Sequence, residues 1–516
     1  MKKRNLFLVC TVVLLSLAMS AVFAAGVGEK APASVQKSST LTLGVSQEAV
    51  GLDPHIVTAF SSMRRIDLLY NRLVRLNENM EVVPDLAESW DIPNNLTYIF
   101  HLRKGVKFHN GRELVADDVK YSLERVLDPK TASPGRSYIA TISKIEVLDA
   151  YTVKITLASP LASLLDALTS NNISIVPREV VEEHGNLQRV VCGTGPYMLE
   201  NWVVDNSMTL VKNPEYFEAG LPKTEKVIFR VIPEEASLLA GIKGGNLDIA
   251  TINDGAAIRQ ASADKSVVVM SKPGMNVRVF SFNNKKAPFD DIRVRQAIAL
   301  AIDRNEILTM AEYGMGAATG PLPISAKAWA IPPEQLPFGK TDYAKAKQLL
   351  AEAGYPNGLS FDIVCSSTYE GGLAVAQVIQ DQLKNIGIQA NLDVVEWGNY
   401  IDRWVKRDFA TMVELRGGSS EPDRFLYRSL HSTGGVNNFM YADKETDALL
   451  ELGRAQTVIA ERKATYDKVQ NVLATNVPLV FLYSPNENQV TSPYVQGFKL
   501  VGNGSLFYVT HAEVIR

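Results

Sequence analysis

The sequence predicts an α/β protein made of several packed lobes with mixed sheets. Strand-like and helical segments alternate along most of the chain, an order that is typical of α/β folds. The chain has 516 residues, and removal of an expected 24-residue signal leaves 492. That length is well above the ~250 to 300 residues at which a single hydrophobic core stops growing. No period of ~20 to 50 residues repeats, which argues against a solenoid or a propeller.

The N-terminus has the pattern of a secretory signal peptide. Basic residues 2–4 precede an apolar run from Leu6 to Ala18, and small residues precede the expected cleavage after Ala24. The run is shorter than the ~20 residues that span a bilayer. Cys10 lies inside this run and not at the cleavage point, so we expect no lipid anchor. We predict a signal peptide at 1–24, a flexible leader at 25–40 and a periplasmic mature protein.

The first half of the mature chain predicts strands, a loop and two helices. A strand is expected at 41–45, and alternating apolar residues predict half-buried strands at 96–102 and 151–157. A helix between these two strands begins near Asp117 and stops at Pro129. An earlier helix is expected where apolar residues recur at helical spacing, at Ile66, Leu69, Leu73 and Leu76.

The second half predicts further helices that begin at acidic residues. One opens at Asp291 and another at Asp342, and the second ends at Gly354, a residue favoured at helix ends. Five more strands are expected between the helices, at 227–232, 277–282, 359–364, 389–395 and 479–483.

Composition excludes some partners. The chain is 46% hydrophobic and 21% charged, with a net charge of -3 and no basic block. This argues against nucleic acid or an anionic membrane as the partner. Cys192 and Cys365 are far apart in sequence and have no CxxC pattern, so we expect two buried free thiols.

No catalytic or metal-binding motif is recognisable. The chain has no GxSxG, HExxH or GxxxxGK[ST] sequence, and the segment 193–196 is a glycine turn without the rest of a nucleotide fingerprint. No two of the six histidines have the i, i+4 spacing that places two imidazoles on one metal. We therefore expect a protein that is not an enzyme and that has neither a cofactor nor a metal. A metal site assembled from distant histidines, or a pair of catalytic carboxylates, is the alternative.

Two segments have the composition of ligand-binding loops. Residues 396–400 follow a predicted strand and include Trp397, whose ring offers a broad apolar surface for stacking. Residues 415–423 combine glycines, which free backbone groups for hydrogen bonding, with small serine donors. From composition alone, a surface loop and a core tryptophan remain the alternative.

Several blocks, in order, resemble the extracellular solute-binding proteins of family 5, which serve peptide, opine and nickel ABC importers. The resemblance covers nearly all of the mature chain. The matching blocks are 52–55, Trp90, 98–108, Gly111, 117–119, 193–197, 213–216, 287–297 and 301–304.

The resemblance implies a bilobal fold with the ligand between two large lobes and with a small inserted domain. The implied segments are lobe I at 41–82, 194–283 and 488–516, the inserted small domain at 83–193, and lobe II at 284–487. It also implies the substrate-binding component of an ABC importer, which binds a peptide or peptide-like solute and delivers it to the membrane permease. We expect a monomer. Ligand alternatives are an oligosaccharide, an opine or a glutathione-like compound, and a secreted hydrolase of small peptides or glycans is the alternative of a different class.

One departure from the family pattern concerns the amino group of a peptide ligand. Peptide-binding members place an aspartate three residues before the acidic-Pro pair, and here Gly418 stands three residues before Glu421-Pro422. A buried ammonium group without a carboxylate partner is costly. Either another acid reaches the ligand, or the ligand lacks a free amine.

The predicted ligand-binding residues combine the local composition with the resemblance. Arg416 could pair a ligand carboxylate through two hydrogen bonds, and an ordinary surface arginine is the alternative. The full set is Phe60, Asn253, Asn283, Trp397, Arg416, Gly418, Ser419, Ser420 and Asn438.

Overall fold

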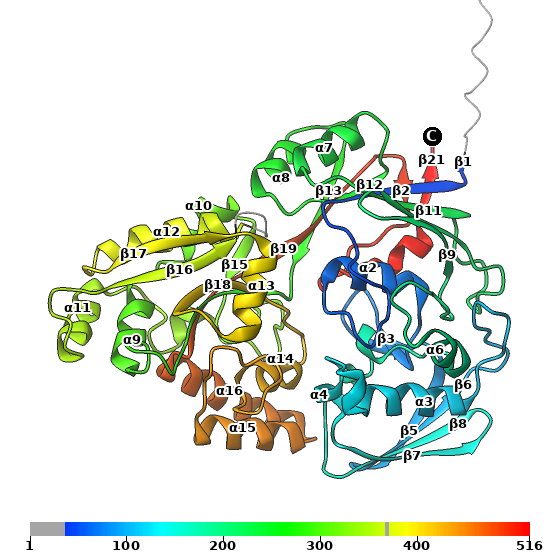
Figure 1. Ribbon diagram of the computed structural model, residues 1–516, viewed down its shortest axis with the longest axis horizontal. Helices are drawn as coiled ribbons and strands as arrows, with labels where there is room; N and C mark the ends of the chain where they lie inside the picture. Colours follow the sequence, from blue (N-terminus) through cyan, green and yellow to red (C-terminus); the bar gives the residue numbers. More distant parts are fainter. Residues whose placement is uncertain (1–36, 367–370) are drawn as a thin grey trace, which may run out of the picture.

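The computed structural model describes residues 37–366 and 371–516, so the expected signal peptide lies outside the described residues, as does the leader up to residue 36. Two large lobes are joined at the top of Figure 1, with a third, smaller unit at the lower right. Within the described ranges, no helix is both long and apolar enough to cross a membrane. The expected bilobal α/β architecture is confirmed, whereas the residue limits of the domains stay a prediction.

One mixed sheet runs through both lobes. In the described part of the chain it has 12 strands, and β13 (Val268–Pro273) and β15 (Gly316–Ala318) pair with its longest strand, β19. Ten strands form the continuous path: β17 (Gln389–Val395), β16 (Ser360–Ser366), β18 (Thr411–Arg416), β14 (Val277–Phe282), β19 (Leu479–Thr491), β12 (Ile249–Thr251), β2 (Thr40–Val45), β11 (Lys226–Val231), β10 (Ser207–Lys212) and β9 (Tyr197–Val203).

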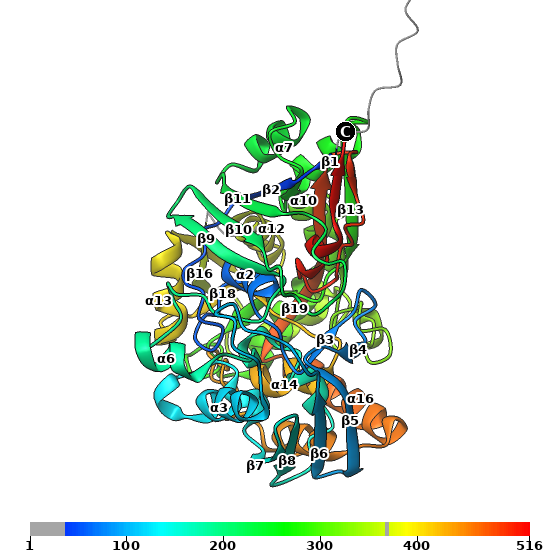
Figure 2. The same ribbon diagram turned by 90° about the vertical axis from the view of Figure 1, so that its right-hand side faces the viewer.

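The smaller unit has its own sheet and its own core. The sheet order is β5 (Ala87–Asn94), β6 (Thr97–Leu102), β8 (Thr152–Leu157) and β7 (Ile142–Asp149). Alternate residues of β6 and β8 are buried, as predicted, and they join a cluster that includes Phe100, Val119 and Leu123. Helix α3 (Ala116–Leu127) lies along this sheet, at the bottom of Figure 2. We call this unit the small domain.

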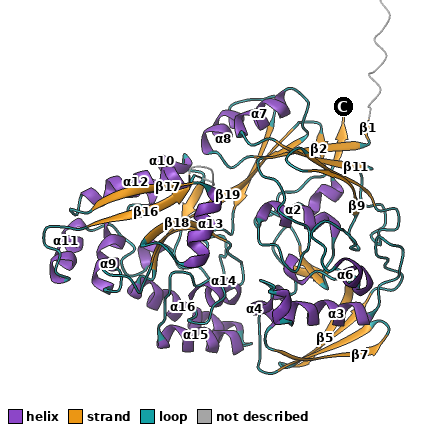
Figure 3. Cartoon of the chain, in the orientation of Figure 1, coloured by secondary structure: helices purple, strands orange, loops and turns teal. Residues whose placement is uncertain are grey.

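Short strands complete the lobe I side, with β1 (Lys37–Ser38), β21 (Glu513–Ile515) and β20 (Val495–Gln496) in one sheet and β3 (Val74–Leu76) and β4 (Val82–Pro84) in another. The helices lie outside the sheets, as Figure 3 shows. Besides α3, the α-helices are α2 (Phe60–Leu69), α4 (Arg136–Ile139), α5 (Leu164–Ala167), α6 (Arg178–His184), α7 (Glu235–Lys243), α8 (Gly255–Ser262), α9 (Ile292–Ala301), α10 (Arg304–Glu312), α11 (Tyr343–Glu352), α12 (Gly372–Lys384), α13 (Trp397–Lys406), α14 (Pro422–Leu430), α15 (Lys444–Ala455) and α16 (Ile459–Asn476). The 3₁₀ helices are Pro129–Thr131, Asn171–Ile173, Pro333–Gln335 and Phe507–His511.

The helix predicted through Leu76 is shorter than expected. It ends at Leu69, because Tyr70 is extended (φ -134°, ψ 152°) and residues 74–76 form β3. The backbone N–H groups of residues 85 and 87 both donate to the carbonyl of Leu73, at 3.3 and 3.0 Å. The carbonyl of Leu73, which would accept a hydrogen bond within a longer helix, therefore accepts bonds from residues 85 and 87 instead.

The remaining predicted elements agree with the structure. Asp291 and Asp342 cap α9 and α11, since each side chain accepts a hydrogen bond from a backbone N–H of the first turn. Cys192 and Cys365 are both buried and free, as expected. Strand β19 is much longer than predicted, because it continues from lobe II, where it pairs with β14, into lobe I, where it pairs with β12 and β13.

Two chain crossings therefore join the lobes. One is β19, and the other is the turn at 274–276 between β13 and β14. All six residues of β14 are buried, and four of them pack in the cores of lobe II. When only a few chain segments connect two lobes and these segments lie side by side, the lobes can move about them as about a hinge.

A cleft between the lobes

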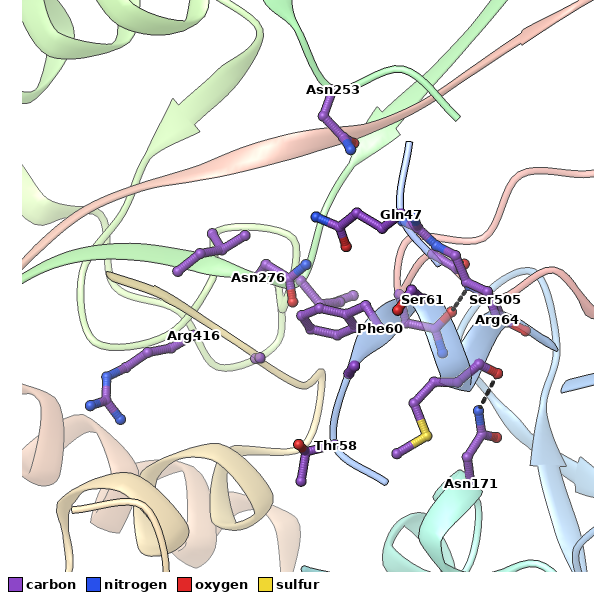
Figure 4. Close-up of a pocket in the computed structure, with 18 of the residues that line it drawn as sticks. Gln47, Thr58, Phe60, Ser61, Arg64, Asn171, Asn253, Asn276, Arg416 and Ser505 are labelled. Atoms are coloured by element: carbon purple, nitrogen blue, oxygen red, sulfur yellow. Dashed lines mark hydrogen bonds between the residues drawn. The ribbon is translucent and has the colours of Figure 1, made fainter. Parts of the chain in front are cut away.

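A cavity of about 2100 Å³ lies between the lobes. Its walls come from lobe I within residues 46–76, from the small domain within 132–140 and 169–172, from the crossing at 275–276, and from lobe II within 397–436. Figure 4 shows side chains of both lobes around this space.

The lobe I wall is centred on Phe60 at the start of α2. Its ring extends toward lobe II, and the amides of Gln47 and Asn276 lie near it in Figure 4. The ring already approaches the opposite lobe, since a Cβ atom added to Gly417 would lie 3.6 Å from Cζ of Phe60. The predicted residue Phe60 therefore faces the predicted glycine-serine loop across the cavity.

The glycine-serine loop follows β18 and forms part of the lobe II wall. Gly418 and Ser419 line the cavity, whereas Ser420 is not among the lining residues. A Cβ atom at Gly418 would lie 1.8 Å from the carbonyl oxygen of Met275, so no side chain fits there without a backbone shift. The hydroxyl of Ser419 accepts a hydrogen bond from the N–H of Glu421 at 3.1 Å.

Helix α13 gives lobe II an apolar face toward the cavity. Trp397 stacks on Tyr400 with ring centroids 5.4 Å apart and an angle of 14° between the planes. Trp397 keeps 36% of its surface exposed, as expected for a plate on which a ligand could stack. The other lining residues of this helix are Tyr400, Ile401, Trp404 and Val405.

Arg416 does not offer the free guanidinium fork that the sequence predicted. It is 6% exposed, and Figure 4 shows its side chain directed away from Phe60. It donates to Oε2 of Glu414 at 2.9 Å, to the carbonyl of Val436 at 3.1 Å and to Oδ1 of Asn438. Burial lowers the pKa of Arg416, and Glu414 opposes that shift. Bidentate binding of a ligand carboxylate would require these bonds to break.

The predicted asparagines have three different positions. Asn253 lies at the upper edge of the cavity, where its backbone N–H donates to Glu235 at 2.8 Å. Asn438 is buried behind the wall, in contact with Arg416. Asn283 is buried away from the cavity, where it donates to the carbonyl of Arg407 at 3.2 Å. Asn283 therefore supports the end of β14 and is not among the residues that line this cavity.

The sequence did not indicate that Glu414, Gln47 and Asn276 belong to the walls. Of these three residues, only Glu414 could have been recognised from the sequence. It lies two positions before Arg416 on a strand whose other side chains are uncharged. Two charged residues at i and i+2 share one face of a strand, so their burial as a pair was foreseeable.

The small domain touches lobe II across the lower end of the cavity. The hydroxyl of Ser163 donates to Asp423 at 2.7 Å, and Arg428 donates to the hydroxyl of Tyr138, also at 2.7 Å. Arg424 and Asp166 form an ion pair with an N–O distance of 3.4 Å. We call these contacts the cleft bridge.

The charges of the cleft bridge alter the acidity of its members. Burial raises the pKa of Asp166, although Arg424 opposes the shift. Burial also acts to raise the pKa of Tyr138, but Arg428 and Arg424 outweigh it and leave the pKa below its usual value.

A second charged contact joins the small domain to lobe I. Arg125 of α3 binds Asp53 through two hydrogen bonds of 3.0 and 2.7 Å. His55 bonds through Nε2 to the carbonyl of Ser174 at 2.8 Å, and Nδ1 faces Arg125 at 2.9 Å. Because a guanidinium only donates, Nδ1 must be the acceptor and His55 is neutral. We call these contacts the fixed seam.

Comparisons with known proteins agree with this architecture. The family model described as "Bacterial extracellular solute-binding proteins, family 5 Middle" matches residues 81–437. Heme-binding protein A of Haemophilus influenzae is 29% identical over 500 residues, which cover 90% of this chain and 91% of that protein. The dipeptide-binding protein of Escherichia coli is 29% identical over 506 residues, 90% of this chain and 93% of that protein.

A solved structure resembles the whole described fold. The binding protein AgaA of A. tumefaciens R10 in complex with agropinic acid has a TM-score of 0.82 and 27% sequence identity, and the match covers 92% of this chain and 98% of that chain. The family match spans more than half of the sequence and includes the small domain and most of lobe II. The chain belongs to the bacterial extracellular solute-binding proteins of family 5.

Proposed function

We propose that this protein is the periplasmic, monomeric binding component of an ABC importer and that it captures a peptide-like solute without a free α-amino group. The observation that carries the proposal is the cavity of about 2100 Å³ between two hinged lobes, whose walls combine an aromatic face with hydrogen-bonding groups. Drug-sized ligand pockets have volumes of ~300 to 1000 Å³. This space is large enough for several residues.

The glycine at position 418, where peptide-binding members carry an aspartate, supports a blocked or modified peptide. Gly418 is packed against the carbonyl oxygen of Met275. This position therefore has no carboxylate and no room for one. Among the described lining acids near this loop, Glu414 already pairs with Arg416. An ammonium group beside Gly418 would lose its hydration without gaining a carboxylate partner from that position.

The relatives' names point to different solutes, namely heme, a dipeptide and agropinic acid. Of these, a peptide or an opine fits the mixed polar and apolar walls of this cavity. Lobe closure would then be driven by the ligand, which binds both walls in the closed form and so favours that form. The closed form would dock on the permease, and the solute would leave unchanged.

Calorimetry with two matched peptides tests the proposal. We expect N-acetyl-trialanine to bind more tightly than free trialanine to the mature protein, and mass spectrometry of the mixture to recover both peptides intact. Tighter binding of the free peptide would mean that another acid holds the amine. Appearance of cleavage products would favour the secreted hydrolase instead.

A further inference from the structure

Three buried polar side chains contact one another in the lobe II wall. Glu414 and Arg416 share one face of β18, and Asn438 follows α14 in the next loop. They are 3%, 6% and 5% exposed, respectively. Arg416 connects the other two, because its Nη2 donates to Oε2 of Glu414 and to Oδ1 of Asn438. Trp404 also donates to Oε2 of Glu414, at 2.8 Å.

Each of the three side chains keeps one buried polar atom without a hydrogen-bond partner. These atoms are Oε1 of Glu414, Nε of Arg416 and Nδ2 of Asn438. The orientation of the amide is fixed, because a guanidinium has only donors and must face the amide oxygen. The cluster thus offers one free acceptor and two free donor groups. Buried polar groups in proteins are almost always paired, so these atoms indicate a missing partner.

The cluster borders the ligand cavity. Glu414 and Arg416 line it directly, together with Tyr400, Trp404 and Val436 around them. The carboxylate and the guanidinium already balance each other's charge at 2.9 Å. Another buried ion would leave this pair with an uncompensated charge, which is costly. A neutral group fits better.

We infer that this cluster is a subsite for a neutral hydroxyl or carboxamide group of the solute. A hydroxyl has one donor and two acceptor lone pairs, which matches one free oxygen, on Glu414, and two free donor nitrogens, Nε of Arg416 and Nδ2 of Asn438. The inference rests on the proposed function, since it assumes a peptide-like solute in the cavity. It adds a preference for solutes that carry serine, asparagine or sugar-like hydroxyls near helix α13.

A serine scan of one peptide tests the subsite. The probes are N-acetyl-trialanine and its three derivatives with a single serine, each titrated by calorimetry into the wild-type protein and two variants. Asn438→Leu removes the free amide donor. Asn283→Leu is the matched control, because Asn283 is also a buried asparagine but lies away from the cavity.

For the wild-type protein and the Asn283→Leu variant we expect one serine position to tighten binding roughly tenfold over N-acetyl-trialanine, the size of effect that one well-placed buried hydrogen-bonding group gives. Asn438→Leu should lose this gain. If Asn438→Leu does not fold, Glu414→Gln replaces it, since a neutral amide at that position disrupts the pair with Arg416 and should also lose the gain.

Two results would overturn the subsite while leaving the proposed function intact. One is binding of all four peptides without any serine preference, and the other is a preference that persists in Asn438→Leu or in Glu414→Gln. A crystal structure with an ordered water, and no peptide hydroxyl, on the three atoms would have the same meaning. If none of the four peptides binds, the proposed function fails and the subsite fails with it.

Discussion

Two of the charged contacts that hold the small domain differ greatly in construction. In the fixed seam, Asp53 and Arg125 are 0% and 9% exposed at their side chains and share two hydrogen bonds. In the cleft bridge, Asp166 and Arg424 are 11% and 23% exposed and share one contact of 3.4 Å. The first contact joins the small domain to lobe I and the second joins it to lobe II across the cavity.

This difference indicates which contact stays formed and which one breaks when the two lobes separate. A buried, bidentate pair with further hydrogen bonds is strongly destabilising when one partner is lost. A single, longer and partly hydrated contact contributes little. We therefore expect the small domain and lobe I to move together, held by the fixed seam, and the cleft bridge to open when the lobes separate. Hinge closure requires this combination.

The largest expected effect comes from breaking the fixed seam. Asp53→Ala leaves Arg125 and the N–H of Leu187 without their buried acceptor. We expect the free energy of unfolding to fall by about 3 to 5 kcal/mol, measured by urea denaturation at pH 7. Glu124→Ala is the control, since its contact with Lys120 is exposed and 4.0 Å long, and its effect should stay below about 1 kcal/mol. If the two substitutions lower the free energy of unfolding equally, the fixed seam is no stronger than an exposed ion pair.

The fixed seam also predicts a dependence of stability on pH. Burial, followed by the charge of Arg125, lowers the pKa of His55 from 6.5 to about 4. Because the folded protein binds this proton less readily than the unfolded chain, its stabilisation is complete above pH 6.5 and is lost as the pH falls toward 4. The contribution is about 3 kcal/mol over that range.

The measurement compares urea denaturation of the wild-type protein and His55→Gln at several pH values between 7 and 4. We expect the stability of the wild-type protein to fall more steeply with decreasing pH than that of the variant. His109 also has a pKa lowered to about 4, but it is present in both proteins and cancels in the comparison. Parallel curves would show that His55 is not held neutral by the seam.

Local patterns in the sequence predicted most of the fold and part of the site. The alternation in β6 and the caps at Asp291 and Asp342 depend on neighbouring residues, so they are readable from sequence. Phe60 and Trp397 were predicted and line the cavity. Asn283 was predicted beside them but does not line the cavity, because the end of a strand does not reveal which side of the sheet faces that space.

The contacts that sequence reasoning missed join distant segments. Tyr138 and Arg428 are 290 positions apart, and Ser163 and Asp423 are 260 positions apart. Neither side of these pairs has a local pattern that distinguishes it from an ordinary surface residue. Likewise, the helix predicted through Leu76 was shortened by pairing with β4, a tertiary effect that outweighs helical spacing.

Removing hydrogen bonds of the cleft bridge should have the smallest effect on the free energy of unfolding and the largest effect on the separation of the lobes. The double variant Ser163→Ala/Arg428→Met removes two hydrogen bonds across the cavity and leaves no buried charge unpaired. At about 1 kcal/mol for each bond, the free energy of unfolding should fall by roughly 2 kcal/mol at most. The ligand-free protein should nevertheless open, and small-angle X-ray scattering should show a larger radius of gyration than for the wild-type protein. An unchanged radius would mean that these two hydrogen bonds do not hold the lobes at this separation.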